Sequence, residues 1–74
     1  MSTAVAARIN GKTIELFDRN GNSVNSAGAT GLAYDEKWVN AYVNGNLLVA
    51  TSDRGTMVTW ELRPNSSPVV IGRR

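Results

Sequence analysis

Apolar and polar residues alternate with a period of two near the start of this chain, a pattern typical of strands in a half-buried antiparallel sheet. The apolar positions of the first two runs are Val5, Ala7, Ile9, Ile14 and Leu16. Asn10-Gly11 separates these runs, and Asn-Gly indicates a hairpin with a two-residue turn. We therefore expect a hairpin in which Ala7 faces Ile14 and Val5 faces Leu16, with one apolar side and one polar side.

A second turn signal follows at Arg19-Asn20-Gly21, where glycine ends a three-residue loop. This turn predicts a third strand in which Val24 lies opposite Leu16. Residues 5–26 are thus expected to form a three-stranded meander with a single apolar face.

The same arrangement recurs 34 residues later. When residues 5–24 are laid over residues 39–58, Asn10-Gly11 matches Asn44-Gly45 and Val24 matches Val58, and a one-residue gap also matches Asp18 with Asp53. A fixed repeat of this kind indicates internal duplication. The second copy is therefore expected to be a meander over residues 38–63.

The second turn of this copy, Asp53-Arg54-Gly55, sets a register of its own. It places Val58 opposite Ala50 and Trp60 opposite Leu48. The apolar residues of the third strand are therefore expected on the same side of the sheet as those of the hairpin.

These patterns predict one all-β domain spanning residues 1–74, built as two antiparallel three-stranded meanders with little or no helix. The two apolar faces can bury each other as a small sandwich or as a six-stranded barrel. Residues 27–37 are the expected connector, and alternation of Leu32 with Tyr34 extends the third strand into it. Residues 64–74 are the expected tail, mobile at Arg73-Arg74, in which 69–72 can return as a short edge strand.

The stretch LLVATSDRGTMVTWEL, residues 47–62, resembles the middle strands of a WD-type β-propeller blade. It has a hydrophobic strand, an Asp-x-Gly turn, and a strand that ends on Trp60 and an acid, but it lacks the Gly-His element. The resemblance implies a ring assembled from several chains, since 74 residues are fewer than two blades of ~40 residues each. A propeller-like assembly thus stays open beside the sandwich and the barrel.

The amino-acid composition excludes several kinds of functional site. The chain has no cysteine and no histidine, which removes disulfides, most nucleophile and base pairs, and the usual zinc ligands. We therefore expect that the protein is not an enzyme and that it has no catalytic residue, no metal and no cofactor. The N-terminus shows no signal peptide and no run long enough to cross a membrane, so the expected location is cytoplasmic.

The two copies differ on the side that faces away from the predicted core. The first copy carries polar residues there, whereas the second carries Trp38, Asn40, Tyr42, Leu47 and Val49. Because monomers seldom expose large apolar patches, this candidate interface predicts a homo-oligomer or another protein partner. Two alternatives stay open: residues 25–37 or 69–72 cover the face within the same chain, or its aromatic residues form a platform for bases or a sugar.

Basic residues suggest a second, less favoured function. The formal net charge is +2, too small to require a polyanionic partner. A nucleic-acid site on the turns would use Arg8, Lys12, Arg19, Arg54 and Arg63. Asp18 and Asp53 lie next to two of these arginines and reduce the local positive potential.

Overall fold

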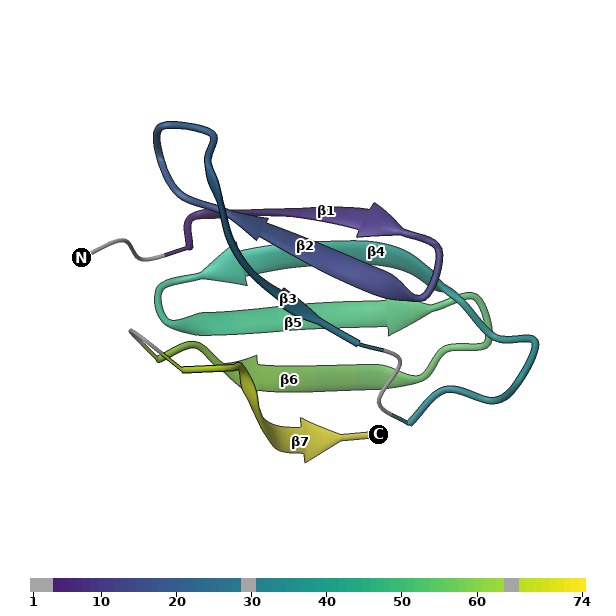
Figure 1. Ribbon diagram of the computed structural model, residues 1–74. Helices are drawn as coiled ribbons and strands as arrows, with labels where there is room; N and C mark the ends of the chain where they lie inside the picture. The colour runs from purple at the N-terminus through teal and green to yellow at the C-terminus, as the bar shows by residue number, and fades with distance from the viewer. Residues whose placement is uncertain (1–3, 29–30, 64–65) are drawn as a thin grey trace.

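The computed structural model describes residues 4–28, 31–63 and 66–74, which form seven strands in two antiparallel sheets with no helix among them (Figure 1). The first sheet holds β1 (Ala6–Asn10), β2 (Thr13–Phe17) and β3 (Ser23–Ala27) in that order. The second sheet holds β4 (Trp38–Asn44), β5 (Leu47–Ser52), β6 (Met57–Glu61) and β7 (Val69–Arg73). The predicted all-β class and the two meanders are confirmed, and the sheets do not close into a barrel.

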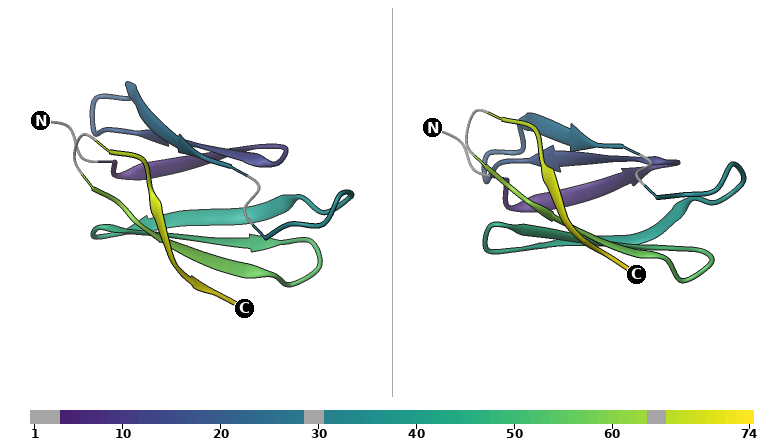
Figure 2. Two further views of the ribbon diagram at one scale, coloured as in Figure 1. Left: turned by 60° about the horizontal axis from the view of Figure 1, so that its bottom comes forward. Right: turned by 90° about the horizontal axis from the view of Figure 1, so that it is seen from below.

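The two sheets lie one above the other, with β1 over β4 (Figure 2). Their facing sides supply the core, whose largest fully buried side chains are Ile14, Leu16, Leu48, Val58 and Trp60. Within this core the Trp38 and Trp60 rings meet edge to face, with centroids 5.5 Å apart and planes at 71°. Aromatic pairs prefer such a T-shaped contact because a ring edge is positive and a ring face negative.

Both Asn-Gly hairpins are present, but each is two residues out of the predicted register. Ala7 pairs with Leu16 rather than with Ile14, because asparagine ends the strand and the turn is formed by Gly11 and Lys12. Gly11 has φ of 64°, a left-handed value that glycine adopts without the strain of a Cβ atom. A two-residue shift preserves the faces of a strand, so Ile14 and Leu16 remain in the core as predicted, whereas Val5 is exposed.

The third strands of the two copies differ. In the second copy Val58 pairs with Ala50 and Trp60 with Leu48, as predicted. In the first copy a bulge follows Leu16, which pairs with Asn25, so the predicted pairing with Val24 is wrong. The extra residue of a bulge reverses the alternation beyond it.

The element bounds support the duplication. Adding 34 to the bounds of β3, Ser23–Ala27, reproduces those of β6, Met57–Glu61. Adding 34 to the pair Ala7 and Leu16 gives residues 41 and 50, which are also paired. The two meanders therefore have equivalent hairpins and strands.

The connector and the C-terminus differ from expectation in two ways. Leu32 and Tyr34 lie in a turn region and do not extend β3. Residues 69–72 form an edge strand as predicted, but Arg73 belongs to it and Arg74 continues the pairing. The Arg74 N–H donates to the Met57 carbonyl at 2.7 Å, and the Met57 N–H donates back at 3.0 Å.

Candidate interaction face

The outer side of the second sheet faces away from the first sheet, and we call it the outer face. On β5 the outer face consists of the residues that alternate with the buried Leu48 and Ala50. On the neighbouring strands it consists of the residues paired with these, strand by strand across the sheet. Together they are Asn40, Tyr42, Asn44, Leu47, Val49, Thr51, Met57, Thr59, Glu61 and Val69. Four of the five residues predicted for the interface are therefore together here.

Trp38 is the exception, and its predicted place on this face is wrong. A bulge between Trp38 and Asn40 turns the tryptophan to the inner side, where it is only 2% exposed. Its indole N–H donates to the carbonyl oxygens of Lys12, at 3.1 Å, and of Gly28, at 3.3 Å. Trp38 is thus a core residue that ties β4 to the first sheet.

Tyr42 is the exposed aromatic residue of the outer face and lies on β4, an edge strand of the second sheet. It pairs with Val49, and Val49 pairs with Thr59. Tyr42 is 50% exposed, and Met57 and Val69 are 42% and 38% exposed. Met57 and Val69 were not among the residues predicted for this face, although the predicted turn already places Met57 across from Thr51.

Exposed apolar side chains gather on the second sheet. Among the described residues eight large apolar side chains are exposed, and six of them belong to this sheet: Val39, Tyr42, Met57, Val69, Val70 and Ile71. The side chains of β7 extend this apolar surface to the edge of the sheet. Neither cover proposed from the sequence forms, since β7 pairs beside β6 and Tyr42 remains half exposed.

The corresponding side of the first sheet is chemically different. Arg8 pairs with Glu15 there, at the positions that lie 34 residues before Tyr42 and Val49. Cross-strand neighbours interact directly, so the first copy has an acid and a base where the second has an aromatic and an aliphatic residue. The duplicated halves thus have equivalent backbone pairing but differ in the side chains on their outer sides.

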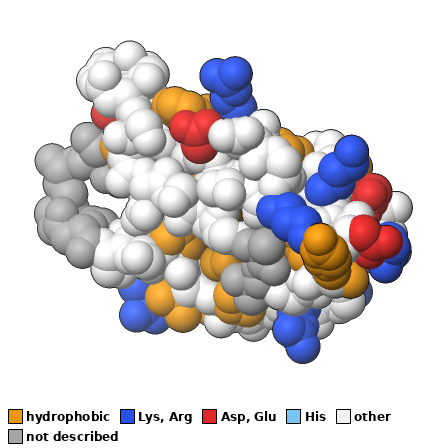
Figure 3. Space-filling view, turned by 45° about the vertical axis from the view of Figure 1, so that its right-hand side comes forward, with side chains coloured by type: hydrophobic (Ala, Val, Ile, Leu, Met, Phe, Trp, Pro, Cys, Tyr) orange, Lys and Arg blue, Asp and Glu red, His pale blue; other side chains and the backbone are white. Residues whose placement is uncertain are grey.

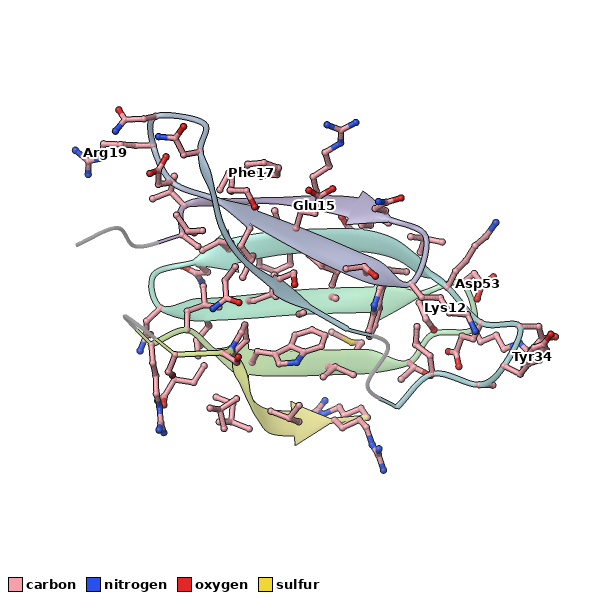
Figure 4. The ribbon with its side chains drawn as sticks, in the orientation of Figure 1. Lys12, Glu15, Phe17, Arg19, Tyr34 and Asp53 are labelled. Carbon is pink, nitrogen blue, oxygen red and sulfur yellow. The ribbon has the colours of Figure 1, made fainter. Side chains whose placement is uncertain are left out.

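The five basic residues of the alternative site are not brought together. Arg19 lies on the β2–β3 loop and Lys12 at the opposite end of the molecule (Figure 4). Arg54 forms an ion pair with Asp35, and Arg63 forms one with Glu61. Figure 3 shows the basic side chains of one side as separate groups, with acidic groups beside several of them.

Lys12 has a structural role that the sequence did not reveal. Its Nζ donates to the carbonyl oxygens of Tyr34 and Ala33, the latter at 3.4 Å, and lies 5.4 Å from the centre of the Tyr34 ring. The ammonium group therefore holds the connector by hydrogen bonds and by a cation–π contact. Tyr34 nevertheless remains 89% exposed.

Glu36 is the buried carboxylate of the connector. One of its oxygens accepts the Ala33 N–H at 2.9 Å, and the other accepts the Ser52 hydroxyl. These bonds, with one from Thr56, lower the pKa of Glu36 to about 2, against the opposing effect of burial. A carboxylate with so low a pKa is a weak base, and the Ser52 Oγ already accepts two backbone N–H groups, so this pair is suited to holding loops together rather than to nucleophilic chemistry.

The described residues contain no group of three or more acidic side chains placed to hold a metal ion. Within the same ranges no helix is long and apolar enough to cross a membrane. Comparisons with protein-family models, with curated proteins and with solved structures find no match for this chain.

Proposed function

We propose that this protein is a non-enzymatic binding and assembly module that self-associates through the outer face of its second sheet. The observation that carries the proposal is the contrast between the two copies: Tyr42 and Val49 stand where the first copy has Arg8 and Glu15. Transfer of such apolar surface out of water is favourable and roughly proportional to its area.

Charge supports a second copy as the partner. Glu61 is the charged residue on the outer face, and it is already paired with Arg63. Two outer faces can therefore meet without opposing like charges at their centre, an arrangement that would otherwise cost several kcal/mol. Sheets commonly pack face to face in this way, about 10 Å apart.

The exposed edge of β7 is a poorer surface for association than the outer face. A bulge lies between Thr59 and Trp60 where β7 pairs with β6, and the strand ends in Arg73. Bulges and charged side chains at edges disfavour pairing with further strands. The face is thus the more suitable contact for a second molecule.

The test is sedimentation velocity over a range of protein concentrations, comparing the native chain with the double variant Tyr42→Arg and Val49→Glu. This variant places the cross-strand pair of the first copy on the second sheet, so the monomer should remain folded. We expect concentration-dependent dimerisation of the native protein and at least about a tenfold weaker association of the variant, equivalent to about 1.4 kcal/mol.

The matched control is Thr13→Arg on the outer side of the first sheet, at the position equivalent to Leu47. It should associate like the native protein. A native chain that stays monomeric at all concentrations, or a double variant that associates normally, would contradict the proposal. Salt-dependent binding of single-stranded DNA by a monomer would favour the nucleic-acid function instead.

For the location we propose the cytoplasm. The support is the composition alone: the sequence has no cysteine, and a cytoplasmic protein needs none. Fractionation of cells that express the chain with its native N-terminus tests this proposal, and recovery in a membrane or secreted fraction would overturn it.

A further inference from the structure

The strand β7 lies outside the duplicated unit. The strands β1 to β3 have counterparts in β4 to β6, whereas β7 adds a fourth strand to the second sheet and has no equivalent beside β3 (Figure 1). All five residues of β7 are exposed. The strand is therefore held mainly by its backbone and contributes little side-chain burial.

The edge of β6 is well adapted to an extended segment. Gly72 pairs with Thr59 and Val69 with Glu61, and Val70 lies across from the buried Trp60. At the far end the side chain of Arg73 lies against Gly31, where an added Cβ would come within 2.6 Å of the Arg73 Cδ. The contacts define one register and one direction for the strand.

We infer that this edge of β6 is a strand-binding site, filled by β7 of the same chain in the monomer and by β7 of a second copy in a dimer. The inference rests on the proposed self-association and gives it a specific geometry. The occupant is β7 because β7 already pairs with this edge within one chain. The β7 strand of a second copy would make the same contacts with β6.

Two physical reasons favour exchange. A strand with little side-chain burial belongs to the less stable parts of a fold, which open without global unfolding. Once β7 has left, the backbone groups of β6 that paired with it are unpaired, and an unpaired strand edge readily accepts another chain. Exchange of identical elements is a low-cost route to dimers because only the connection between the elements changes.

The test uses the double variant Thr59→Cys and Gly72→Cys in a chain that has no cysteine of its own. A Cβ placed at Gly72 lies 3.9 Å from the Thr59 Cβ, within the ~3.5–4.5 Å span of a disulfide. Oxidation therefore joins β6 to whichever β7 occupies the site. The reduced variant should have the circular dichroism and the urea midpoint of the native protein, which shows that it folds.

The expected result has two parts. Oxidation at high concentration, after association, gives a covalent dimer that reducing agent returns to monomer. Oxidation at high dilution gives an internally bridged monomer whose dimerisation is weakened at least tenfold and is restored by reduction. Thr59→Cys alone measures any cross-linking through the outer face, on which Thr59 also lies, and the double variant should give more covalent dimer than this single variant.

Other outcomes overturn the inference. A bridged monomer that dimerises like the native protein would mean that β7 stays in its own chain, and the face proposed above would be untouched. A double variant that gives no more covalent dimer than Thr59→Cys alone would show that β7 does not exchange. Loss of association in the bridged monomer, with normal association of the Tyr42→Arg and Val49→Glu variant, would support exchange and contradict the face.

Discussion

Asp18 and Ser52 occupy equivalent positions, 34 residues apart, and each closes the second turn of its copy. Asp18 Oδ1 accepts the N–H groups of Asn20 and Asn22 at 2.9 and 3.0 Å. Ser52 Oγ accepts the N–H groups two and four residues later at 3.2 and 3.0 Å. The sequence alignment that matched Asp18 with Asp53 through a gap is therefore wrong, because hydrogen bonding aligns the copies without one.

Replacing each of these side chains by the other is expected to have unequal effects on stability. Asp18→Ser retains an oxygen that can accept the two N–H groups, so the free energy of unfolding should fall by less than about 1 kcal/mol. Ser52→Asp should be more destabilising, because it removes the hydroxyl that donates to Glu36 and places a second carboxylate beside that group. Urea unfolding of both variants measures the difference, and equal losses would contradict the role of the Glu36 contact.

Glu36 predicts an acid-sensitive stability. Its pKa is about 2 in the folded chain and 4.5 ordinarily, so between these values the unfolded chain binds more protons than the folded one. The stabilisation is fully present above pH 4.5 and is lost as the pH falls toward 2. The urea midpoint of the native protein should fall across this window, and the difference between native protein and Glu36→Gln should shrink toward its lower end. A difference that does not vary with pH would contradict the assignment.

Trp38 predicts a loss of stability rather than a loss of association. Trp38→Ala should cost about 3–5 kcal/mol, as expected for a large buried side chain, and this is comparable with the stability of a small domain. Trp38→Phe keeps most of the packing and loses the indole N–H bonds, so about 1–2 kcal/mol is expected. Tyr42→Ala is the control, with less than about 1 kcal/mol expected because Tyr42 is half exposed. Urea unfolding followed by tryptophan fluorescence ranks the variants, and a stable Trp38→Ala protein would contradict the core position.

Lys12 predicts a local effect in the connector. Lys12→Met keeps the aliphatic stem and removes the ammonium group that donates to the carbonyl oxygens of Ala33 and Tyr34. Amide hydrogen exchange across residues 33–36 should rise about fivefold, equivalent to about 1 kcal/mol, with little change in β5. Lys37→Met, an exposed lysine of the same connector, should leave these rates unchanged. A uniform rise across both sheets would instead indicate global destabilisation.

Local chemistry explains why much of the fold was predictable. The turn residues Gly21 and Gly55 both have positive φ, and the short turns that they end bring neighbouring segments together whatever the rest of the chain does. The period of two then assigns faces, so Leu48 and Trp60 were correctly placed together in the core. The all-β class, the two meanders and the late edge strand followed from these short-range signals.

Two predicted placements were wrong because one extra residue in a strand moved the side chains beyond it to the opposite side of the sheet. The bulges after Leu16 and at Val39 insert a residue into the ladder, which displaces Val24 from its predicted partner and moves Trp38 from the outer side to the core. A bulge leaves little trace in the alternation, because it is selected by what the strand packs against. The predicted placement on the outer side was therefore right for Tyr42 and Val49 and wrong for Trp38.

The sequence by itself determined the class of fold, the strand order within each meander and the difference in polarity between the two copies, since all three depend on residues close together in the chain. Only the tertiary structure showed that Trp38 is buried beside Trp60, that Lys12 contacts Tyr34, and that the Glu36 carboxylate lies buried against Ser52. These relationships join residues that are distant along the chain, and only the packing of one sheet on the other brings their atoms within reach.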